Sequence, residues 1–251
     1  MEYGLIGGRL GHSYSKEIHE RLADYSYELT PLTEDEFDVF MEERPFKAIN
    51  VTIPYKQKVI PYLESMDERA SSIGAVNTIV NRDGKLYGYN TDYPGFLYML
   101  NGNGITVKGK KLLIIGNGGA AKAVKACVRD EGAAELVIVR RSSDDECVSY
   151  DEVYRDHTDA EIVINTSPVG MYPDTDASPL DLSSFGRCEA VVDLIYNPIT
   201  TMLVAQAREL GMKGVTGLEM LIAQAKYAVE IFLGKEIPDD VIGDIYRDMT
   251  K

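Results

Sequence analysis

The sequence predicts an α/β protein of two domains, and three observations lead to this prediction. From Lys110 onward, apolar runs of strand length alternate with helical patterns, as in a doubly wound parallel sheet. Around 101–104, the preceding helical pattern gives way to a polar link that contains glycine, where we place the domain boundary. Soon after this link, the apolar run Leu112–Ile115 ends in glycines and continues into good helix formers. Strand and helix patterns also mix before the link, so we expect an α/β fold on both sides of it.

The first expected strand covers residues 3–7, and a glycine-rich loop leads from it to a helix expected over 16–23. Ser13 and Ser15 stand just before this helix, where a serine hydroxyl can accept from a free backbone N–H and contribute about 1 kcal/mol. On spacing alone, helix capping is therefore favoured over ligand binding for both serines. A capping box of Thr33 and Glu36 opens the next expected helix.

A β-branched strand over 48–53 ends at Pro54, a residue typical of the first turn of a helix. Lys56 would then lie in that first turn, where the positive end of the helix dipole disfavours a charged ammonium. A lysine placed in this way and partly buried can give and take protons near neutral pH. A solvated surface lysine is the alternative that the pattern leaves open.

Two strand-like runs, over 74–80 and 86–92, flank the segment Asn81–Gly84, whose Asp-Gly pair predicts a hairpin. A short helix over 67–72 is expected before them. Asp92 comes directly before a further helical pattern that begins at Tyr93. Taken by itself, Asp92 is therefore best interpreted as the cap of that helix.

The glycines after Leu112–Ile115 match the pattern G-x-G-x-x-A, with Gly116, Gly118 and Ala121 at the fixed positions. Gly116 can make the tight turn, Gly118 lets the backbone approach a pyrophosphate, and Ala121 lets helix and strand pack closely. The start of the helix offers free N–H groups to the same anion. A turn without a ligand is the alternative, but the legible strand and helix favour a Rossmann-like dinucleotide site.

The end of the next strand indicates which dinucleotide is bound. An NAD-binding domain usually places a carboxylate there for the ribose 2′-hydroxyl, whereas this chain has Arg140 and Arg141. Guanidinium groups suit the 2′-phosphate of NADP by charge and by bidentate geometry. Asp144 and Asp145 follow closely and oppose this argument, but NADP remains the favoured cofactor.

The remaining strands of this domain are expected over 135–139, 162–165, 190–194 and 213–215. The loop Asn165–Pro173 follows the carboxyl end of one of them, which is where ligands bind in such sheets. A long apolar helix is expected over 216–232, with Gln224 as its polar exception.

Composition excludes several classes of partner. With 26 basic and 40 acidic residues, the net charge of −14 opposes binding to nucleic acid or to an anionic membrane. The three cysteines are far apart and form no C-x-x-C pair, so neither a disulfide framework nor a zinc site is expected. The first residues lack the pattern of a signal peptide, and we expect a cytoplasmic protein.

Six motifs together resemble the shikimate dehydrogenase family over nearly the whole chain, from Gly4 to about Leu233. They are the loop 8–15, the lysine motif 50–56, the segment 74–78, the segment 88–96, the fingerprint 116–121 and the helix start 217–224. The resemblance implies an enzyme for the reversible, NADPH-dependent reduction of 3-dehydroshikimate to shikimate, in the biosynthesis of chorismate and the aromatic amino acids.

The resemblance also implies the domains and the site residues. Residues 1–101, completed by the C-terminal helices 217–251, would form the substrate domain, and residues 102–216 the NADP domain. Lys56 would be the general acid and base, and Asp92 would orient it and a substrate hydroxyl. No metal is implied, and the protein would be a monomer or a homodimer. Substrate contacts are implied for Ser13, Ser15, Thr52, Lys56, Asn77, Asp92, Tyr196 and Gln224, and cofactor contacts for Gly116, Asn117, Gly118, Gly119, Ala120, Arg140, Arg141, Leu194 and Gly217.

Chemistry supports these assignments, because a polyhydroxylated ring acid needs neutral partners that both donate and accept. The chain departs from the family pattern at Lys16, at Asn117 and at Arg140–Ser142. A quinate/shikimate enzyme, possibly NAD-dependent, is the close alternative. A nucleotide-sensing module without catalysis is the more distant one, and the joint presence of Lys56 and Asp92 argues against it.

Overall fold

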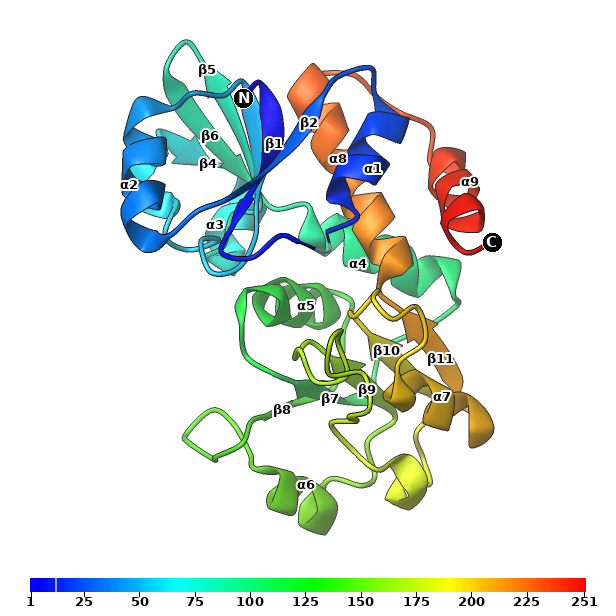
Figure 1. The fold of residues 1–251 in the computed structure, drawn as a ribbon. Helices are drawn as coiled ribbons and strands as arrows, with labels where there is room; N and C mark the ends of the chain where they lie inside the picture. The colour runs from blue at the N-terminus through cyan, green and yellow to red at the C-terminus, as the bar shows by residue number, and fades with distance from the viewer. Residues whose placement is uncertain (12) are drawn as a thin grey trace. The chain divides into compact units, whose positions relative to one another are not determined.

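The computed structural model describes residues 1–11 and 13–251, and the chain divides into two compact units. The first unit combines residues 1–95 with residues 221–251, and the second comprises residues 96–220. Each unit has its own β-sheet with helices around it (Figure 1). The α/β class expected from the sequence is confirmed. The boundaries of the units lie six residues before and four residues after the ends of the expected central domain.

The first unit contains a mixed sheet with the strand order β2-β1-β3-β5-β6-β4. β1 pairs in parallel with β2 and β3, whereas β5 is antiparallel to both β3 and β6. Asp83 and Gly84 join β5 to β6 with positive φ angles of 53° and 82°, as a tight hairpin turn requires. The hairpin prediction is thus confirmed. The strands are β1 (Tyr3–Gly7), β2 (Tyr27–Pro31), β3 (Ala48–Val51), β4 (Ser65–Met66), β5 (Thr78–Arg82) and β6 (Lys85–Tyr89).

Successive residues of a strand point to opposite sides of a sheet, so both faces of this sheet carry side chains. Helices cover both faces. Ile6 and Ile49 pack against Phe37 on one face, whereas Leu5 packs with Tyr27 on the other. The predicted capping box of α2 is present. The helices are α1 (Ser15–Leu22), α2 (Glu34–Glu43), the 3₁₀ helix η1 (Ile60–Tyr62), α3 (Glu68–Ile73), α8 (Leu218–Leu233) and α9 (Asp240–Met249), of which α8 begins in the second unit.

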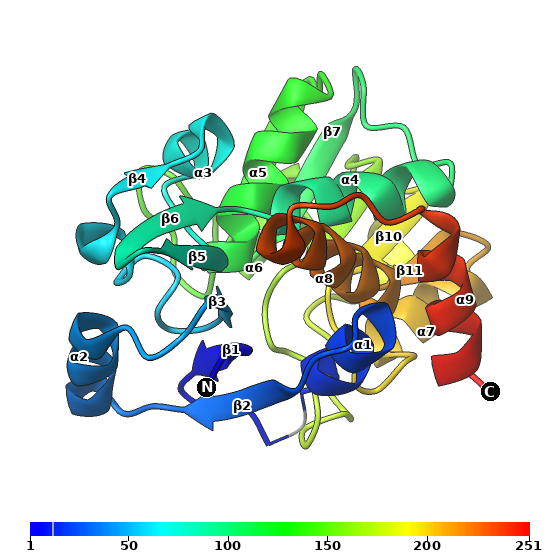
Figure 2. The ribbon, with the colours of Figure 1, turned by 90° about the horizontal axis from the view of Figure 1, so that it is seen from above.

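The N-terminal and C-terminal parts of the sequence both contribute a helix to the same side of the first unit. α1 and α9 lie side by side although more than 200 residues separate them in the sequence (Figures 1 and 2). A guanidinium nitrogen of Arg21 lies 3.7 Å from a carboxylate oxygen of Asp248. Exposed pairs of this kind contribute little, so apolar burial of Ile18, Ile242 and Ile245 is the larger contribution to holding these helices.

The second unit contains a parallel sheet with the order β11-β10-β9-β7-β8. The order reverses between β7 and β9, which creates the switch point at which doubly wound sheets bind ligands. The Rossmann-like prediction is confirmed. The strands are β7 (Lys111–Ile115), β8 (Glu135–Val139), β9 (Ile162–Asn165), β10 (Ala190–Asp193) and β11 (Lys213–Thr216).

Helices lie on both faces of this parallel sheet as well. Leu113 and Val139 pack in one cluster with Val153 and Leu203, which belong to α6 and α7. α5 lies on the opposite side of the sheet from α6 (Figure 1). Because the strands are buried on both faces, they appear in the sequence as unbroken apolar runs. The helices are α4 (Asp92–Gly102), which begins in the first unit, α5 (Gly119–Asp130), α6 (Tyr150–Asp156), the 3₁₀ helix η2 (Leu182–Ser184) and α7 (Met202–Glu209).

Among the glycines of the second unit, Gly217 leaves the least room for a Cβ atom. A Cβ atom there would overlap the backbone carbonyl group of Leu194, and backbone atoms cannot yield as a flexible side chain does. We expect Gly217→Ala to lower the free energy of unfolding by about 3 kcal/mol or more, as measured by urea denaturation. Gly186→Ala is the matched control, since nothing lies within 4 Å of a Cβ at that glycine. Equal stability of the two variants would contradict this account of Gly217.

Candidate active site

Lys56 lies in a turn that follows β3, and the predicted helix around it is wrong. The backbone carbonyl of Lys56 accepts from the N–H of Val76 at 2.8 Å, whereas the N–H of Ile60 bonds to Gln57. The i-to-i+4 bond that a helix needs at Lys56 is therefore replaced by a bond to a distant segment. As a result, no helix dipole acts on this lysine. The turn instead fixes Lys56 against the segment 74–77, with a side chain that is 13% exposed.

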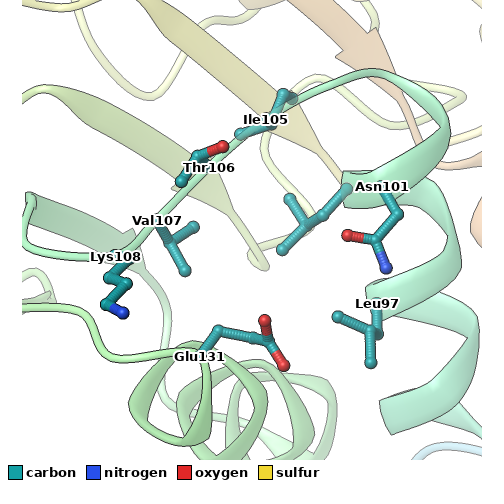
Figure 3. A pocket seen from close by; sticks show the side chains of 8 residues that line it. Leu97, Asn101, Ile105, Thr106, Val107, Lys108 and Glu131 are labelled. Carbon is teal, nitrogen blue, oxygen red and sulfur yellow. The ribbon is translucent and has the colours of Figure 1, made fainter.

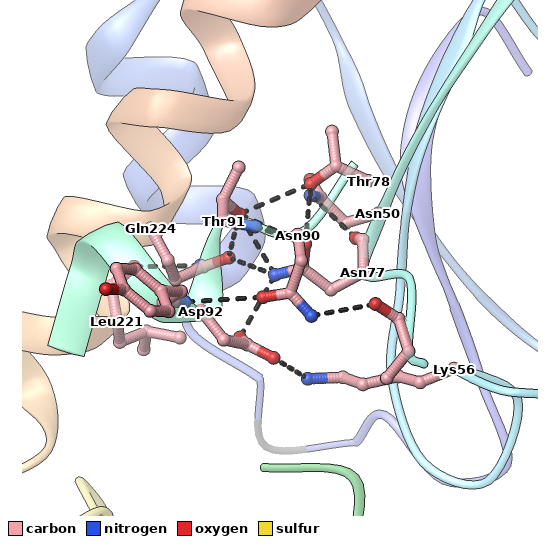
Figure 4. Close-up of polar contacts among 11 residues, drawn as sticks. Asn50, Lys56, Asn77, Thr78, Asn90, Thr91, Asp92, Leu221 and Gln224 are labelled. Carbon is pink, nitrogen blue, oxygen red and sulfur yellow. Dashed lines mark hydrogen bonds and ion pairs between the residues drawn. The ribbon is translucent and has the colours of Figure 1, made fainter. Parts of the chain in front are cut away.

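Asp92 is the first residue of α4 rather than its cap, so the capping interpretation is wrong. The carbonyl oxygen of the Asn90 side chain takes that role by accepting from the N–H of Tyr93 at 3.3 Å. This leaves the carboxylate of Asp92 available for side-chain contacts. Its Oδ2 atom lies 2.5 Å from Nζ of Lys56 (Figure 4). Asp92 is 6% exposed, so a nearly buried ion pair forms where the sequence predicted the catalytic pair.

Asn77 and Gln224 complete this group of polar side chains. Nδ2 of Asn77 donates to Oδ1 of Asp92 at 3.0 Å and lies 3.5 Å from Oε1 of Gln224 (Figure 4). Gln224 comes from α8, 147 positions further along the chain than Asn77. The first unit therefore brings together Lys56, Asn77, Asp92 and Gln224, four of the residues expected to contact substrate. We call these four residues the polar cluster.

Other expected substrate residues of the first unit lie on neighbouring segments. Thr52 precedes the turn that carries Lys56, and its N–H donates to Ile6 at 2.9 Å. The predicted capping by Ser13 and Ser15 is only partly correct. Tyr14 is the N-cap of α1 and makes no side-chain cap bond, while the hydroxyl of Ser13 accepts from the N–H of Ser15 at 3.3 Å. His12, which belongs to the same loop motif, lies outside the described residues.

The polar cluster has the composition of an acid/base site. A lysine ammonium in contact with a carboxylate can deliver a proton, and the neutral amine can take one back. Amide groups beside the pair supply donors and acceptors for hydroxyl groups of a ligand. Several of these groups are nearly buried, so their hydrogen bonds are stronger than they would be in water.

The fingerprint of the second unit has the predicted geometry. Gly116 has a φ angle of 100°, and a Cβ there would lie 2.8 Å from Oγ1 of Thr166. Gly118 is the N-cap of α5 and provides no side-chain cap, and nothing lies within 4 Å of a Cβ built on it. The first N–H groups of α5 therefore have room for a phosphate. Ala121 is fully buried in the contact between helix and sheet.

The structure adds Lys125 to this loop, a residue that sequence reasoning missed. Its Nζ donates to Oδ1 of Asn117 at 2.7 Å, although the two residues are eight positions apart. Gly119 and Ala120 open the helix between them. The contact places a positive charge beside the glycine turn, where it complements an anionic ligand. The asparagine in place of a small residue at position 117 could have suggested such a partner.

The two arginines after β8 differ in their surroundings. A guanidinium nitrogen of Arg140 lies 2.9 Å from Oδ2 of Asp144, and the other carboxylate oxygen of Asp144 accepts from the N–H groups of Glu146 and Cys147. These backbone bonds hold the pKa of Asp144 below its usual range, so the carboxylate stays charged. Across residues 1–11 and 13–251, no ion pair joins Arg141 to a carboxylate. Arg141 is therefore the more available of the two guanidinium groups for a phosphate.

Leu194, Tyr196 and Gly217 lie at the carboxyl ends of β10 and β11. Asp193 anchors this region: its carboxylate accepts from the side chains of Asn165 and Thr201 at 3.0 and 2.7 Å and from a backbone N–H at 3.1 Å. Burial raises the pKa of Asp193 to about 6. The same bonds join the segments after β9 and β10, both of which were expected to contact ligands.

The raised pKa of Asp193 predicts how stability depends on pH. The folded chain holds a proton on Asp193 up to about pH 6, whereas the unfolded chain releases it near the ordinary value of 3.8, so stability falls as pH rises through this window. Two pK units correspond to about 3 kcal/mol. We expect Asp193→Asn to flatten this fall in urea denaturation measured across the window. Asp176→Asn, at an exposed carboxylate of the same unit, should leave this fall unchanged. If stability fell with pH as steeply in Asp193→Asn as in the wild type, the prediction would be contradicted.

A hollow of about 170 Å³ lies elsewhere in the second unit, between α4 and the end of α5 (Figure 3). None of the expected site residues lines it. Its polar groups, among them Lys108 and Glu131, are exposed.

Among the described helices, none is long and apolar enough to cross a membrane.

Known proteins resemble this chain over nearly its full length. A shikimate dehydrogenase (NADP(+)) from Clostridium beijerinckii is 37% identical over 259 aligned positions, which cover 97% of this chain and 96% of the relative. The chain belongs to the shikimate dehydrogenase family. The resemblance predicted from the motifs is thereby confirmed, and the chain is an oxidoreductase. The sequence model described as "Shikimate dehydrogenase substrate binding domain" matches residues 5–79.

Solved structures of shikimate dehydrogenases share the fold. A chorismate mutase/shikimate 5-dehydrogenase fusion protein from Clostridium acetobutylicum superposes with a TM-score of 0.92 at 35% identity, covering 99% of this chain and 96% of the other. A shikimate 5-dehydrogenase from Thermus thermophilus, solved in complex with NADP(H) and shikimate, gives a TM-score of 0.87 at 30% identity and covers 99% of both chains.

Three further residues contact the polar cluster but were not among the expected site residues. Asn50, Thr78 and Thr91 are buried and hydrogen-bonded to Asn77. Each of them stands in or next to a motif that was recognised. Their polar side chains at buried strand ends were the available signal.

Proposed function

We propose that this chain is an NADP-dependent shikimate dehydrogenase that catalyses the reversible reduction of 3-dehydroshikimate to shikimate. The contact of 2.5 Å between Lys56 and Asp92, with Asn77 and Gln224 beside it, is the observation that carries the proposal. A chain that only sensed a nucleotide would not need an ammonium and a carboxylate held together in a nearly buried site. The relatives named for this activity match nearly the whole chain.

The residues of the second unit fit NADP. The uncapped start of α5 and the open space at Gly118 suit the pyrophosphate, and the guanidinium of Arg141 suits the 2′-phosphate. Gly116, Asn117, Gly119, Ala120, Leu194 and Gly217 would form the rest of this site. When bound, the nicotinamide ring donates or accepts the hydride.

Lys56 carries the proton that the reaction requires. Reduction of the ketone turns its oxygen into a hydroxyl group, and the ammonium of Lys56 gives that oxygen its proton. In the oxidation of shikimate, the neutral amine of Lys56 removes the hydroxyl proton as the C–H hydride leaves. Asp92 holds Lys56 through Oδ2 and contacts a substrate hydroxyl, which fixes the distance over which the proton moves.

The neutral polar groups recognise the substrate. Asn77 and Gln224 lie next to Asp92 and can bind ring hydroxyls, because an amide offers both a donor and an acceptor. Ser13, Ser15 and Thr52 are proposed to bind the remaining polar groups of the substrate, together with Tyr196. Under this proposal, the substrate domain comprises residues 1–101 with 217–251, and the NADP domain residues 102–216.

The preference for NADP depends on Arg141. We expect Arg141→Ala to raise the KM for NADP about 10- to 100-fold, since a charged hydrogen bond contributes about 1.5–3 kcal/mol, and to change the KM for NAD little. Arg140→Ala should have the smaller effect, because Asp144 already pairs with that guanidinium. Steady-state kinetics with both cofactors measure this. Equal changes in the KM for NADP and NAD would mean that Arg141 does not bind the 2′-phosphate.

Steady-state oxidation of shikimate and of quinate, each with NADP and with NAD, tests the proposed function. The proposal predicts the highest kcat/KM for shikimate with NADP. A preference for quinate with NAD would favour the quinate/shikimate alternative, and the absence of turnover with all four combinations would favour a sensor. We also propose that the protein is cytoplasmic and is a monomer or a homodimer. Its reaction would belong to the biosynthesis of chorismate and the aromatic amino acids.

A further inference from the structure

The side chain of Asn77 has an orientation that its neighbours determine. Its Oδ1 accepts from the backbone N–H of Thr91 at 2.8 Å, and a backbone N–H can only donate. The opposite end of the amide must therefore be the NH₂ group, and this group faces Oδ1 of Asp92 at 3.0 Å (Figure 4). Asn77 thus uses a donor to hold one carboxylate oxygen, which leaves the other to Lys56.

A second buried amide behind Asn77 is oriented by the same logic. Nδ2 of Asn50 donates to the backbone carbonyl of Asn77 and to Oγ1 of Thr78, both at 3.1 Å. A carbonyl can only accept, so the other end of the Asn50 amide is its oxygen. That oxygen accepts from the hydroxyl of Tyr27 at 2.7 Å. The amide oxygen Oδ1 of Asn77 can only accept, so the hydroxyl of Thr78 is the donor in the 3.0 Å bond that joins them.

Tyr27 begins this series as a fixed donor. Its ring is fully buried and stacks on His19, with ring centroids 3.9 Å apart. Burial raises the pKa of Tyr27 well above its ordinary value, so the hydroxyl keeps its proton. Burial also lowers the pKa of His19 to about 3, so the ring stacked on Tyr27 is neutral. Both side chains belong to the first unit, as does every other member of the series.

We propose that Tyr27, Asn50 and Thr78 are positioning residues for catalysis, acting through a one-way series of hydrogen bonds that ends at Asp92. Each member donates to the next: Tyr27 to Asn50, Asn50 to Thr78, Thr78 to Asn77, and Asn77 to Asp92. Hydrogen bonds aligned in one direction polarise one another, and loss of a buried member leaves its partner unsatisfied. The series therefore fixes which oxygen of Asp92 faces Lys56. This inference rests on the proposed function.

Thr78→Val tests the middle of the series, because valine has the shape of threonine without the hydroxyl. We expect the kcat for shikimate oxidation, per mole of folded enzyme, to fall about 10-fold, since small misplacements at an active site are costly. The KM for NADP should stay at the wild-type value. Thr78→Ser restores the hydroxyl and should recover most of the kcat. Tyr27→Phe removes the first donor and should lower the kcat in the same direction, which keeps the test decisive if Thr78→Val does not fold.

Ile79→Val is the matched control. Ile79 is the next residue of β5, is fully buried and packs on the other face of the sheet, so its truncation perturbs packing without touching the series. Its kcat should equal that of the wild type. The inference is overturned if Thr78→Val and Tyr27→Phe keep the wild-type kcat, or if Thr78→Ser falls as far as Thr78→Val. Absence of shikimate oxidation by the wild-type chain would instead contradict the proposed function.

Discussion

Lys56→Ala is expected to lower the kcat for shikimate oxidation about 1,000-fold, within the range that a positioned acid or base contributes. The reason is the loss of the group that exchanges a proton with the substrate oxygen. The KM for shikimate should change much less, because Asn77, Asp92 and Gln224 remain in place to bind the ring. Steady-state kinetics with NADP measure both constants.

Lys58→Ala is the matched control for this prediction. Lys58 lies two residues further along the same turn, but its side chain is exposed and pairs with Glu34 at 2.7 Å. Exposed pairs of this kind contribute at most about 1 kcal/mol, and the residue has no place in the proposed chemistry. Its loss should leave the kcat unchanged. A wild-type kcat in Lys56→Ala would remove Lys56 from the mechanism.

Asp92→Asn is expected to lower the kcat about 100-fold, which is the second largest effect. The substitution keeps the size of the side chain but removes the charge that holds the ammonium of Lys56 at 2.5 Å. It also replaces one carboxylate oxygen with an NH₂ group, which only donates, so either Asn77 or Lys56 loses its acceptor. The KM for shikimate should rise as well, because Asp92 also contacts a substrate hydroxyl in the proposed complex.

Asp83→Asn separates this effect from a general loss of carboxylate charge. Asp83 lies in the exposed hairpin turn with a φ angle of 53°, a conformation that asparagine also adopts readily. Its substitution should leave both kcat and KM unchanged. If Asp92→Asn retained the kcat of the wild type, Asp92 would have no role in orienting Lys56.

Local patterns predicted those parts of the fold whose cause is local. The turn at Gly116 needs a positive φ angle, and the hairpin turn needs a positive φ angle at both Asp83 and Gly84. Because few residue types adopt this conformation readily, these residues indicate the turns in the sequence. The capping box of Thr33 and Glu36 likewise joins residues only three positions apart. In each case, the residue type and the backbone conformation are linked within one turn of chain.

The candidate site depended on contacts that no local pattern encodes. Lys56 lies in a turn because its carbonyl bonds to Val76, and Asp92 is released from capping because Asn90 takes that role. The meeting of Asn77 with Gln224 spans 147 positions. Motif resemblance could indicate which residues belong to the site, but spacing could not predict the geometry that joins them. The one-way series behind Asp92 could be identified only from the structure, since it depends on which end of each amide faces which neighbour.

The most direct test of the account is the initial rate of NADPH formation from shikimate, measured side by side for the wild-type chain, Lys58→Ala and Lys56→Ala. The account predicts equal rates for the first two and a rate about 1,000-fold lower for Lys56→Ala. Equal rates for all three, or no shikimate-dependent NADPH formation by the wild-type chain, would contradict it.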